Sequence, residues 1–362
     1  MNSQSLVRFL IVTLILVLSF SISAVSDEKI HFHGYGELHY NNTDKPGGQD
    51  IMDNHRLVLG WTYTFNKRIK LNVEIDFEHA AKEMELEFAF IDYLINDSFN
   101  IRAGSMLMPI GYLNEYHEPP LFYSVERPYV QKYVIPTTWQ EGGAGIFGIL
   151  NKDIRYRVYL VNGLDASNFK SDSGIRSGRH KVAESPSENL ALTGRVEYGG
   201  IKNLRLGLSG YRGNAGQEAA GIGDAAVTLI EGDVRYSIKG LELTGLFSQV
   251  SIGDTEKINA VTNKGVGETI QGSYFEAGYH LGRHFLPDDN DLIIFVRREL
   301  INTHKEVASG LSPDPKNERN ITTVGAAFFP IKEVVFKADM ESWKDGNDET
   351  WTQFNVGLGY MY

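Results

Sequence analysis

The sequence predicts an all-β fold, a closed transmembrane antiparallel β-barrel of about 16 strands. Two observations lead to this prediction. Segments of about ten residues alternate between apolar and polar side chains, as strands with one apolar and one polar face do. The connections between them are alternately short and long, which is typical of barrels that cross a membrane. The clearest segment is 353–362, in which every second residue from Phe354 to Tyr362 is apolar.

The beginning of the chain has the composition of a secretion signal. Arg8 precedes an apolar stretch at 9–20 that is too short to span a bilayer, and the small residues at 24–26 offer a cleavage site. We therefore expect a signal peptide at residues 1–26 and an outer-membrane barrel domain at residues 27–362. Later apolar runs are shorter than the ~18 residues that a membrane helix needs. A closed barrel can cross a membrane instead, because it pairs every backbone donor and acceptor internally.

The alternating segments define the predicted strands. Their lengths suit membrane strands of ~9–11 residues better than the ~5–6 residues usual in a soluble β-sandwich or propeller, which is the main alternative. Many of their apolar faces end in Tyr, Trp or Phe, as the aromatic girdles at membrane interfaces do. In chain order the predicted strands are 30–40, 55–65, 69–79, 83–95, 99–106, 139–150, 154–162, 190–198, 203–211, 226–238, 241–251, 271–281, 291–300, 320–329, 333–342 and 351–362.

One residue breaks the alternation. Asp92 falls on the apolar face of the strand at 83–95, together with Met84, Leu86 and Phe90. A charge on the lipid face costs a few kcal/mol at the bilayer midplane but little near an interface. We therefore expect Asp92 either to lie at the periplasmic end of the strand or to follow a β-bulge that shifts the register.

The connections support a membrane topology. Two of them depart from the alternation, because 80–82 is short among the long connections and 282–290 is long among the short ones. Short turns belong on the periplasmic side and long loops outside. An even number of strands then puts both termini on the periplasmic side. The short turns are 66–68, 96–98, 151–153, 199–202, 239–240 and 330–332, and the long loops are 41–54, 107–138, 163–189, 212–225, 252–270, 301–319 and 343–350.

The longest connection, 107–138, has an unusual composition. It contains several prolines and many aromatic residues, which stiffen it and give it an apolar side. A loop in solvent needs neither feature, whereas a loop that packs on the barrel wall needs both. We expect it to fold inward as a constriction loop after the fifth strand; the alternative is an outward loop that packs on a neighbouring subunit. Its titratable residues are Glu115, His117, Glu118, Glu126, Arg127 and Lys132.

The polar faces of the strands carry charges of both signs. A barrel of this size encloses a water-filled lumen, and rings of charge in a lumen set ion preference. Because acids predominate, we expect a mild cation preference; the alternative is a solvated wall without tuned selectivity. With the loop residues, the candidate pore-lining residues are Glu74, Asp76, Glu85 and Glu87 on an acidic wall that also holds Glu78 and Glu83, and Arg155, Arg157 and Arg195 on a basic wall that also holds Arg205.

Composition excludes several other functions. The chain has no cysteine and a formal net charge of −11, so we expect neither disulfides nor a nucleic-acid partner, which requires a basic surface. Glu85 and Glu87 lie two apart on a strand and share its wet face, so we expect no catalysis and no cofactor. His31, His33 and His39 share one face of the first strand, but histidines in a lumen need no ligand, so we expect no metal there either.

Several short motifs resemble the phosphate-selective porin O/P family. They are Phe-Ile-Asp-Tyr at 90–93, Arg-Ala-Gly at 102–104, Met-Pro-Ile-Gly at 108–111, Asn-Gly at 162–163 and Val-Phe-Lys-Ala-Asp at 335–339. The resemblance implies a sixteen-stranded, trimeric channel of the bacterial outer membrane. Phosphate-selective members line the constriction with an arginine cluster and a lysine ladder, whereas the 107–138 loop has only Arg127 and Lys132 as cations.

The expected function is therefore that of a porin. The chain would form a water-filled channel for passive diffusion of small hydrophilic solutes and ions, as a homotrimer in outer-membrane lipid. Two alternatives remain open from the sequence. One is a channel specific for a substrate or an anion of the phosphate type, and the other is a non-conducting structural or receptor barrel whose loops bind a partner.

Overall fold

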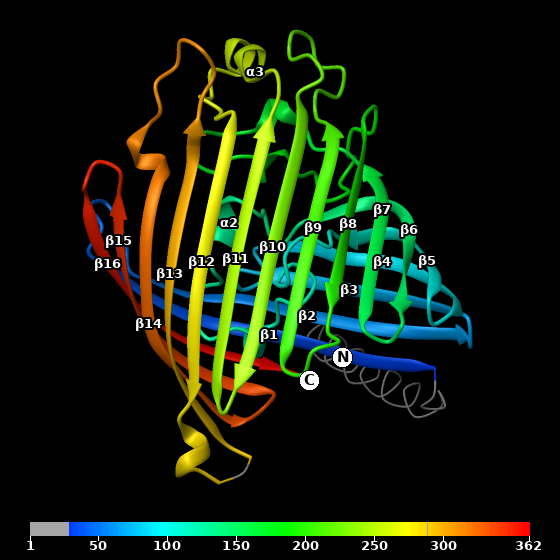
Figure 1. Cartoon of the computed structure of the whole chain (residues 1–362), viewed down its shortest axis with the longest axis vertical. Helices are drawn as coiled ribbons and strands as arrows, with labels where there is room; N and C mark the ends of the chain where they lie inside the picture. Colours follow the sequence, from blue (N-terminus) through cyan, green and yellow to red (C-terminus); the bar gives the residue numbers. More distant parts are fainter. Residues whose placement is uncertain (1–28, 288) are drawn as a thin grey trace, which may run out of the picture.

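The computed structural model describes residues 29–287 and 289–362. The predicted signal peptide at 1–26 lies outside the described residues. Sixteen strands form one closed antiparallel barrel in which each strand pairs with its neighbours in sequence (Figure 1). The first and last strands close it, with Tyr35 opposite Met361 and Thr43 opposite Gln353. The predicted fold class is confirmed.

The strands extend through regular period-two segments. Their bounds agree with the predicted ones to within a few residues, and the largest differences are extensions at the loop ends. The strands are β1 Ile30–Thr43, β2 Ile51–Asn66, β3 Ile69–Glu78, β4 Glu83–Asn96, β5 Phe99–Leu107, β6 Gln140–Leu150, β7 Ile154–Asn162, β8 Leu190–Tyr198, β9 Leu204–Asn214, β10 Ala226–Ile238, β11 Leu241–Ile252, β12 Thr269–His280, β13 Asp291–Glu306, β14 Glu318–Ile331, β15 Val334–Asp345 and β16 Thr350–Met361.

Helical turns occur only in the connections of the described residues. None of these helices is long and apolar enough to span a bilayer. The longest, α3, lies with the long connections at one end of the barrel (Figure 1). The helices are η1 Pro119–Leu121, α2 Val130–Tyr133, η2 Ala166–Asn168, η3 Arg176–Gly178, α3 Thr255–Thr262, η4 Gly282–His284 and η5 Pro315–Asn317.

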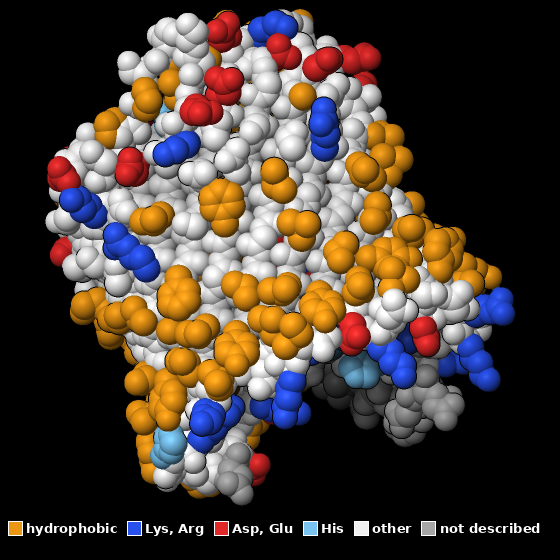
Figure 2. Space-filling view, in the orientation of Figure 1, with side chains coloured by type: hydrophobic (Ala, Val, Ile, Leu, Met, Phe, Trp, Pro, Cys, Tyr) orange, Lys and Arg blue, Asp and Glu red, His pale blue; other side chains and the backbone are white. Residues whose placement is uncertain are grey.

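The two faces of the wall differ in chemistry. Large apolar side chains such as Leu192, Leu208 and Phe275 are exposed on the outside. Figure 2 shows hydrophobic side chains gathered in a band across the strands. The opposite face carries buried charged residues, among them Glu231 and Arg297. An apolar band outside and polar side chains inside are the pattern of a barrel in lipid.

A β-bulge explains the misplaced Asp92. In the pairing of β3 with β4, Glu74 lies opposite Phe88 but Ile75 lies opposite Leu86, so Glu87 is an extra residue. Beyond it the faces exchange, and Asp92 is buried inside, where Arg102 donates two hydrogen bonds to it at 2.8 and 3.0 Å. The bulge alternative is confirmed, and the assignment of Phe90 to the outer face is wrong.

Candidate functional site

The connection between β5 and β6, residues 108–139, contacts side chains from several parts of the wall. β9, β13 and β15 are separated from one another in the barrel, so the segment contacts three different parts of the wall. Its aliphatic residues, such as Met108 and Ile110, are fully buried. Three backbone amides of the segment donate to wall side chains: Gly111 to Ser209 Oγ on β9 (3.1 Å), Val130 to Glu299 Oε2 on β13 (2.9 Å) and Val125 to Asp339 Oδ2 on β15 (2.6 Å).

Arg297 on β13 anchors this segment through a buried, ion-paired side chain. Its side chain is 0% exposed and forms ion pairs with Glu299 (2.8 Å) and Glu276 (3.1 Å). The same guanidinium donates to Ser124 Oγ at 2.5 Å. Lys337 on β15 donates to the backbone oxygen of Ser124 at 2.9 Å. Two wall cations therefore hold one loop residue, and two carboxylates neutralise the first of them.

A second connection, 163–189, contacts the end of the first. Arg179 donates to the backbone oxygens of Pro136 and Thr138, at 2.6 Å each. Arg176 donates to the oxygen of Thr137. Burial, together with nearby Arg179, lowers the pKa of Arg176 to about 9, so it stays protonated at neutral pH. Two cations from this connection thus satisfy backbone oxygens at the end of the first.

Most acids of the predicted acidic wall lie within 4 Å of a basic side chain. Its partners come from other strands and from both connections. Glu83 lies exposed at the start of β4. The pairs are Glu74 with His33 (3.0 Å), Asp76 with Arg56 (3.8 Å), Glu78 with Arg56 (3.4 Å), Glu87 with His117 (3.2 Å) and Glu85 with Lys181.

The predicted basic residues lie in different surroundings. Arg195 is fully buried between Glu197 (2.9 Å), Glu231 (3.1 Å) and Asp233 (2.6 Å), so it is a structural ion pair of the wall. Arg155 lines two cavities. Arg157 lines the larger of these while pairing with Glu197 (2.9 Å) and with Glu115 of the loop (3.2 Å). Burial raises the pKa of Glu115 although Arg157 opposes the rise.

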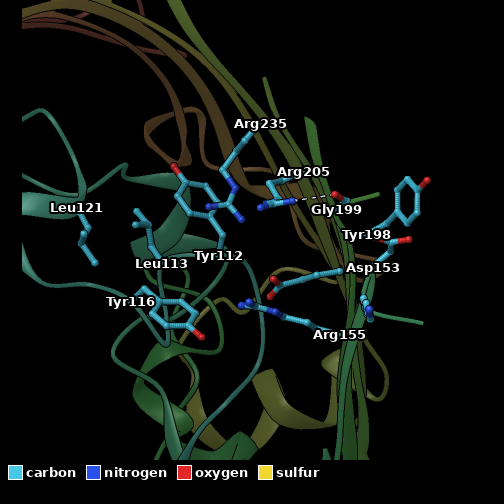
Figure 3. A pocket seen from close by; sticks show the side chains of 12 residues that line it. Tyr112, Leu113, Tyr116, Leu121, Asp153, Arg155, Tyr198, Gly199, Arg205 and Arg235 are labelled. Atoms are coloured by element: carbon cyan, nitrogen blue, oxygen red, sulfur yellow. Dashed lines mark hydrogen bonds between the residues drawn. The ribbon is translucent and has the colours of Figure 1, made fainter. Parts of the chain in front are cut away.

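The first cavity, of about 390 Å³, lies at the end of the barrel that carries the short turns. Arg155 on β7, Arg205 on β9 and Arg235 on β10 reach into it from the wall, opposite Tyr112 and Tyr116 of the loop (Figure 3). The Arg235 guanidinium lies 4.7 Å from the centre of the Tyr112 ring. Arginines on one side and aromatic rings on the other suit planar or anionic solutes.

The second cavity adjoins the first. Its volume is about 1040 Å³, and it shares Tyr116, Lys152 and Arg155 with the first. Arg102 lies at its wall, stacked 3.8 Å from the centre of the Phe90 ring. Two cationic side chains of the short turns, Lys67 and Arg68, also line this cavity.

The third cavity, of about 190 Å³, lies among the loop residues on the other side of the 108–139 segment. Three of the predicted residues line it, Glu126, Arg127 and Lys132. Burial favours the neutral form of Glu126, but a hydrogen bond and the charge of His39 hold its pKa well below the usual range. The other charged residues in its lining are Glu37, Arg56, Glu78, Arg176 and Lys181.

Cations outnumber carboxylates in these three of the cavities, by four to two, six to two and five to three. This excess removes the basis of the expected cation preference, although the whole chain is acidic. The expected cation preference is not supported, because the expectation counted wall acids without their partners. Besides the four arginines of the basic wall, it counted only the cations of the 107–138 loop. The cavity-lining cations that it missed are Arg56, Lys67, Arg68, Arg102, Lys152, Arg176, Lys181 and Arg235.

Two other predicted residues lie in the loop without lining these cavities. His117 is buried, and a hydrogen bond of 2.7 Å joins its Nε2 atom to the Tyr35 hydroxyl. Half-buried Glu118 has a raised pKa, first because of burial, and its Oε2 is unpaired within the described part of the chain. Through Tyr35 and Glu87, His117 anchors the loop to β1 and β4.

Comparisons with known proteins agree with this architecture. The family model of phosphate-selective porin O and P matches residues 31–174. An uncharacterised protein of Aquifex aeolicus is 34% identical over 336 residues, covering 87% of this chain and 76% of that protein. The similarity to the Aquifex aeolicus protein therefore extends well beyond residues 31–174.

Solved structures share the fold at low identity. An anion-selective porin from Comamonas acidovorans has a TM-score of 0.61 at 12% identity, covering 92% of this chain and 99% of that one. The trimer form of in-vitro folded OmpT of Vibrio cholerae has a TM-score of 0.57 at 11% identity, with 92% and 99% coverage. Together the family match, the extended relative and the closed barrel lead to one conclusion: the chain belongs to the phosphate-selective porin O and P family and lies in the outer membrane.

Proposed function

We propose that this porin is a diffusion channel for small hydrophilic solutes that prefers anions over cations. The excess of cations in the three cavities carries the proposal. Fixed charges that line a narrow aqueous path raise the local concentration of counter-ions and so set ion preference. The proposal needs no cofactor and no catalytic group.

The 108–139 segment, whose end contacts 163–189, is the proposed constriction. Its contacts with β9, β13 and β15 support this assignment, because a segment held at those points narrows the space between them. The residues proposed to line the path are those of the cavities. Of the sequence candidates these are Glu115, Glu126, Arg127, Lys132, Arg155 and Arg157.

The test is the reversal potential of single channels in a planar bilayer under a KCl gradient. Potassium and chloride move about equally fast in water, so the sign of the potential reports the fixed charge of the path. We expect stable conductance steps and a reversal potential that is shifted from zero towards the equilibrium potential of chloride. A shift towards the equilibrium potential of potassium would contradict the anion preference. Correctly folded protein that conducts no current would contradict the proposal of a channel.

A second candidate is selectivity for phosphate-type anions. Arg56, Arg127 and Arg176 all line the third cavity, and guanidinium groups match phosphate oxygens in pairs. Arg127 Nη1 is buried and has no hydrogen-bond partner within the described residues, so it is a donor that an anion entering this cavity would satisfy. Saturable block of the chloride current by added inorganic phosphate would support this candidate. A chloride current that phosphate leaves unchanged would favour a general anion channel.

We further propose that the channel is a homotrimer. The trimer form of OmpT, which has the same fold, supports this assembly. The band of exposed apolar side chains offers a surface for subunit contacts as well as for lipid. Mass photometry or chemical cross-linking of the protein in detergent should give three copies per particle; a single copy in mild detergents would contradict it.

A further inference from the structure

Three side chains meet at the rim of the third cavity, Asp53, His55 and His79. One carboxylate oxygen, Asp53 Oδ2, lies 2.7 Å from His79 Nδ1 and 3.2 Å from His55 Nδ1. The three possible ligand atoms all lie within 4.8 Å of one another. None of the predicted pore-lining residues belongs to this cluster, and its residues are not those of the His31, His33 and His39 pattern of the sequence.

The backbone places these groups together through a β-bulge. In the pairing of β1 with β2, Glu37 lies opposite Arg56 but Leu38 lies opposite Asn54, so His55 is the extra residue. Strict alternation would put His55 on the opposite face from Arg56. The bulge lets both line the third cavity. Bulges often re-aim a side chain in this way beside functional sites.

His79 is fixed by the turn that follows β3. Its backbone amide donates to the oxygen of His55 at 3.1 Å, and Ala80 donates to Asn54 at 3.0 Å. The His55 ring is also fixed, because the His39 ring stacks on it at 4.7 Å between centres with 12° between planes. Two separate contacts therefore hold the two imidazoles beside the same carboxylate.

We propose that Asp53, His55 and His79 bind a divalent transition-metal ion such as Zn²⁺. Imidazole nitrogen and carboxylate oxygen are ligands that Zn²⁺ takes at ~2.0–2.2 Å. Ligand atoms around a tetrahedral ion of that size lie ~3.3–3.5 Å apart, so only small side-chain rotations convert the present cluster into a ligand set. The ion replaces the imidazole protons that now point at the carboxylate, and the adjoining cavity leaves room for water as a fourth ligand.

A hydrogen-bonded cluster without metal is the simpler alternative. Asp53 would then serve only to orient two imidazoles. The metal site accounts for more of the geometry, because both histidines direct Nδ1 to one oxygen and both line a cavity through which an ion can enter. A bound dication would also add positive charge beside Arg127 and Lys132, and so strengthen the attraction of this cavity for anions.

The test is Zn²⁺ binding by the refolded full barrel, measured in competition with a chromophoric chelator. We expect one strong site in the native protein. His55→Gln and His79→Asn should each weaken it at least about tenfold. Asn is used at position 79 because the residue has φ 52° and Asn tolerates a left-handed backbone. His31→Gln is the matched control, since His31 is exposed and lies outside the cluster.

X-ray absorption at the zinc edge of the one-to-one complex supplies a second readout. It should report two imidazole nitrogens and light oxygen ligands at ~2.0–2.2 Å. Equal affinity in the native protein and in the variant carrying both substitutions would overturn the site. A spectrum without imidazole scattering would overturn it as well. Both measurements are independent of ion conduction, so they remain decisive if the channel proposal fails.

Discussion

Replacing Arg297 by methionine tests whether buried ion pairs hold the inner segment in place. The substitution keeps much of the side-chain volume but removes the only cation within ion-pair distance of Glu299 among the described residues. It also removes an ion-pair partner of Glu276, 3.1 Å away. A buried pair that loses one partner leaves an uncompensated charge, at a cost of ~3–5 kcal/mol. Ser124 loses a hydrogen bond as well, worth about 1 kcal/mol.

The assay is urea unfolding of the protein in lipid vesicles, followed by the fluorescence of its four tryptophans. We expect Arg297→Met to lower the free energy of unfolding by ~3–5 kcal/mol. Arg298→Met is the control, because Arg298 is the next residue of β13 and is exposed on the outer face, so its replacement leaves no buried carboxylate without its cation. Adding Glu276→Gln and Glu299→Gln to Arg297→Met should recover part of the loss.

The same variant links stability to conduction. Since Arg297 holds Ser124 of the 108–139 segment, the variant should show larger or noisier single-channel conductance than the native protein. A loss of stability no greater than that of Arg298→Met would refute the reasoning that Arg297 is a structural anchor. Unchanged conductance in a clearly destabilised variant would refute its role in holding the constriction.

Three further outcomes are expected. Gly104→Ala should cost about 1–3 kcal/mol in urea unfolding, because Gly104 has φ 139° and an added Cβ would lie 2.3 Å from the oxygen of Ala89; Gly210→Ala, with no neighbour closer than 3.5 Å, should cost less. Arg155→Glu changes the charge beside two cavities by two units, each worth roughly 0.6 kcal/mol for an ion about 7 Å away in water. The local concentration of anions should therefore fall, and that of cations rise, roughly sevenfold each, so the anion-to-cation permeability ratio should fall roughly fiftyfold; an unchanged reversal potential would contradict this. Burial raises the pKa of Glu115, so its negative charge is lost at a higher pH than for an ordinary carboxyl, and acidification towards pH 5 should strengthen anion preference less in Glu115→Gln than in the native channel.

The strands could be predicted because their information is local. A strand in a membrane barrel meets lipid on one side and water or polar groups on the other, so its side chains must alternate. The prediction of 154–162, 190–198 and 226–238 therefore matches the observed strands residue for residue. Turn residues between strands are local as well, and they gave the order and direction of the strands.

Bulges could not be placed from the sequence. An extra residue at His55 or Glu87 exchanges the faces of the strand on one side of it, but alternation alone does not show on which residue the exchange occurs. Asp92 signalled one bulge, because a charge on the outer face was physically costly. His55 gave no such signal, since histidine is tolerated on either face near a membrane interface.

The sequence by itself determined the closed barrel, its topology and the existence of a long, stiff connection after the fifth strand. Only the tertiary structure decided which charges face open space. Glu74, Glu87 and Arg195 contact partners far away in the chain, and Arg56 and Arg176 come together from separate segments at one cavity. The physical reason is that alternation depends on neighbours two residues away, while the charge of a cavity depends on every side chain that reaches it through space.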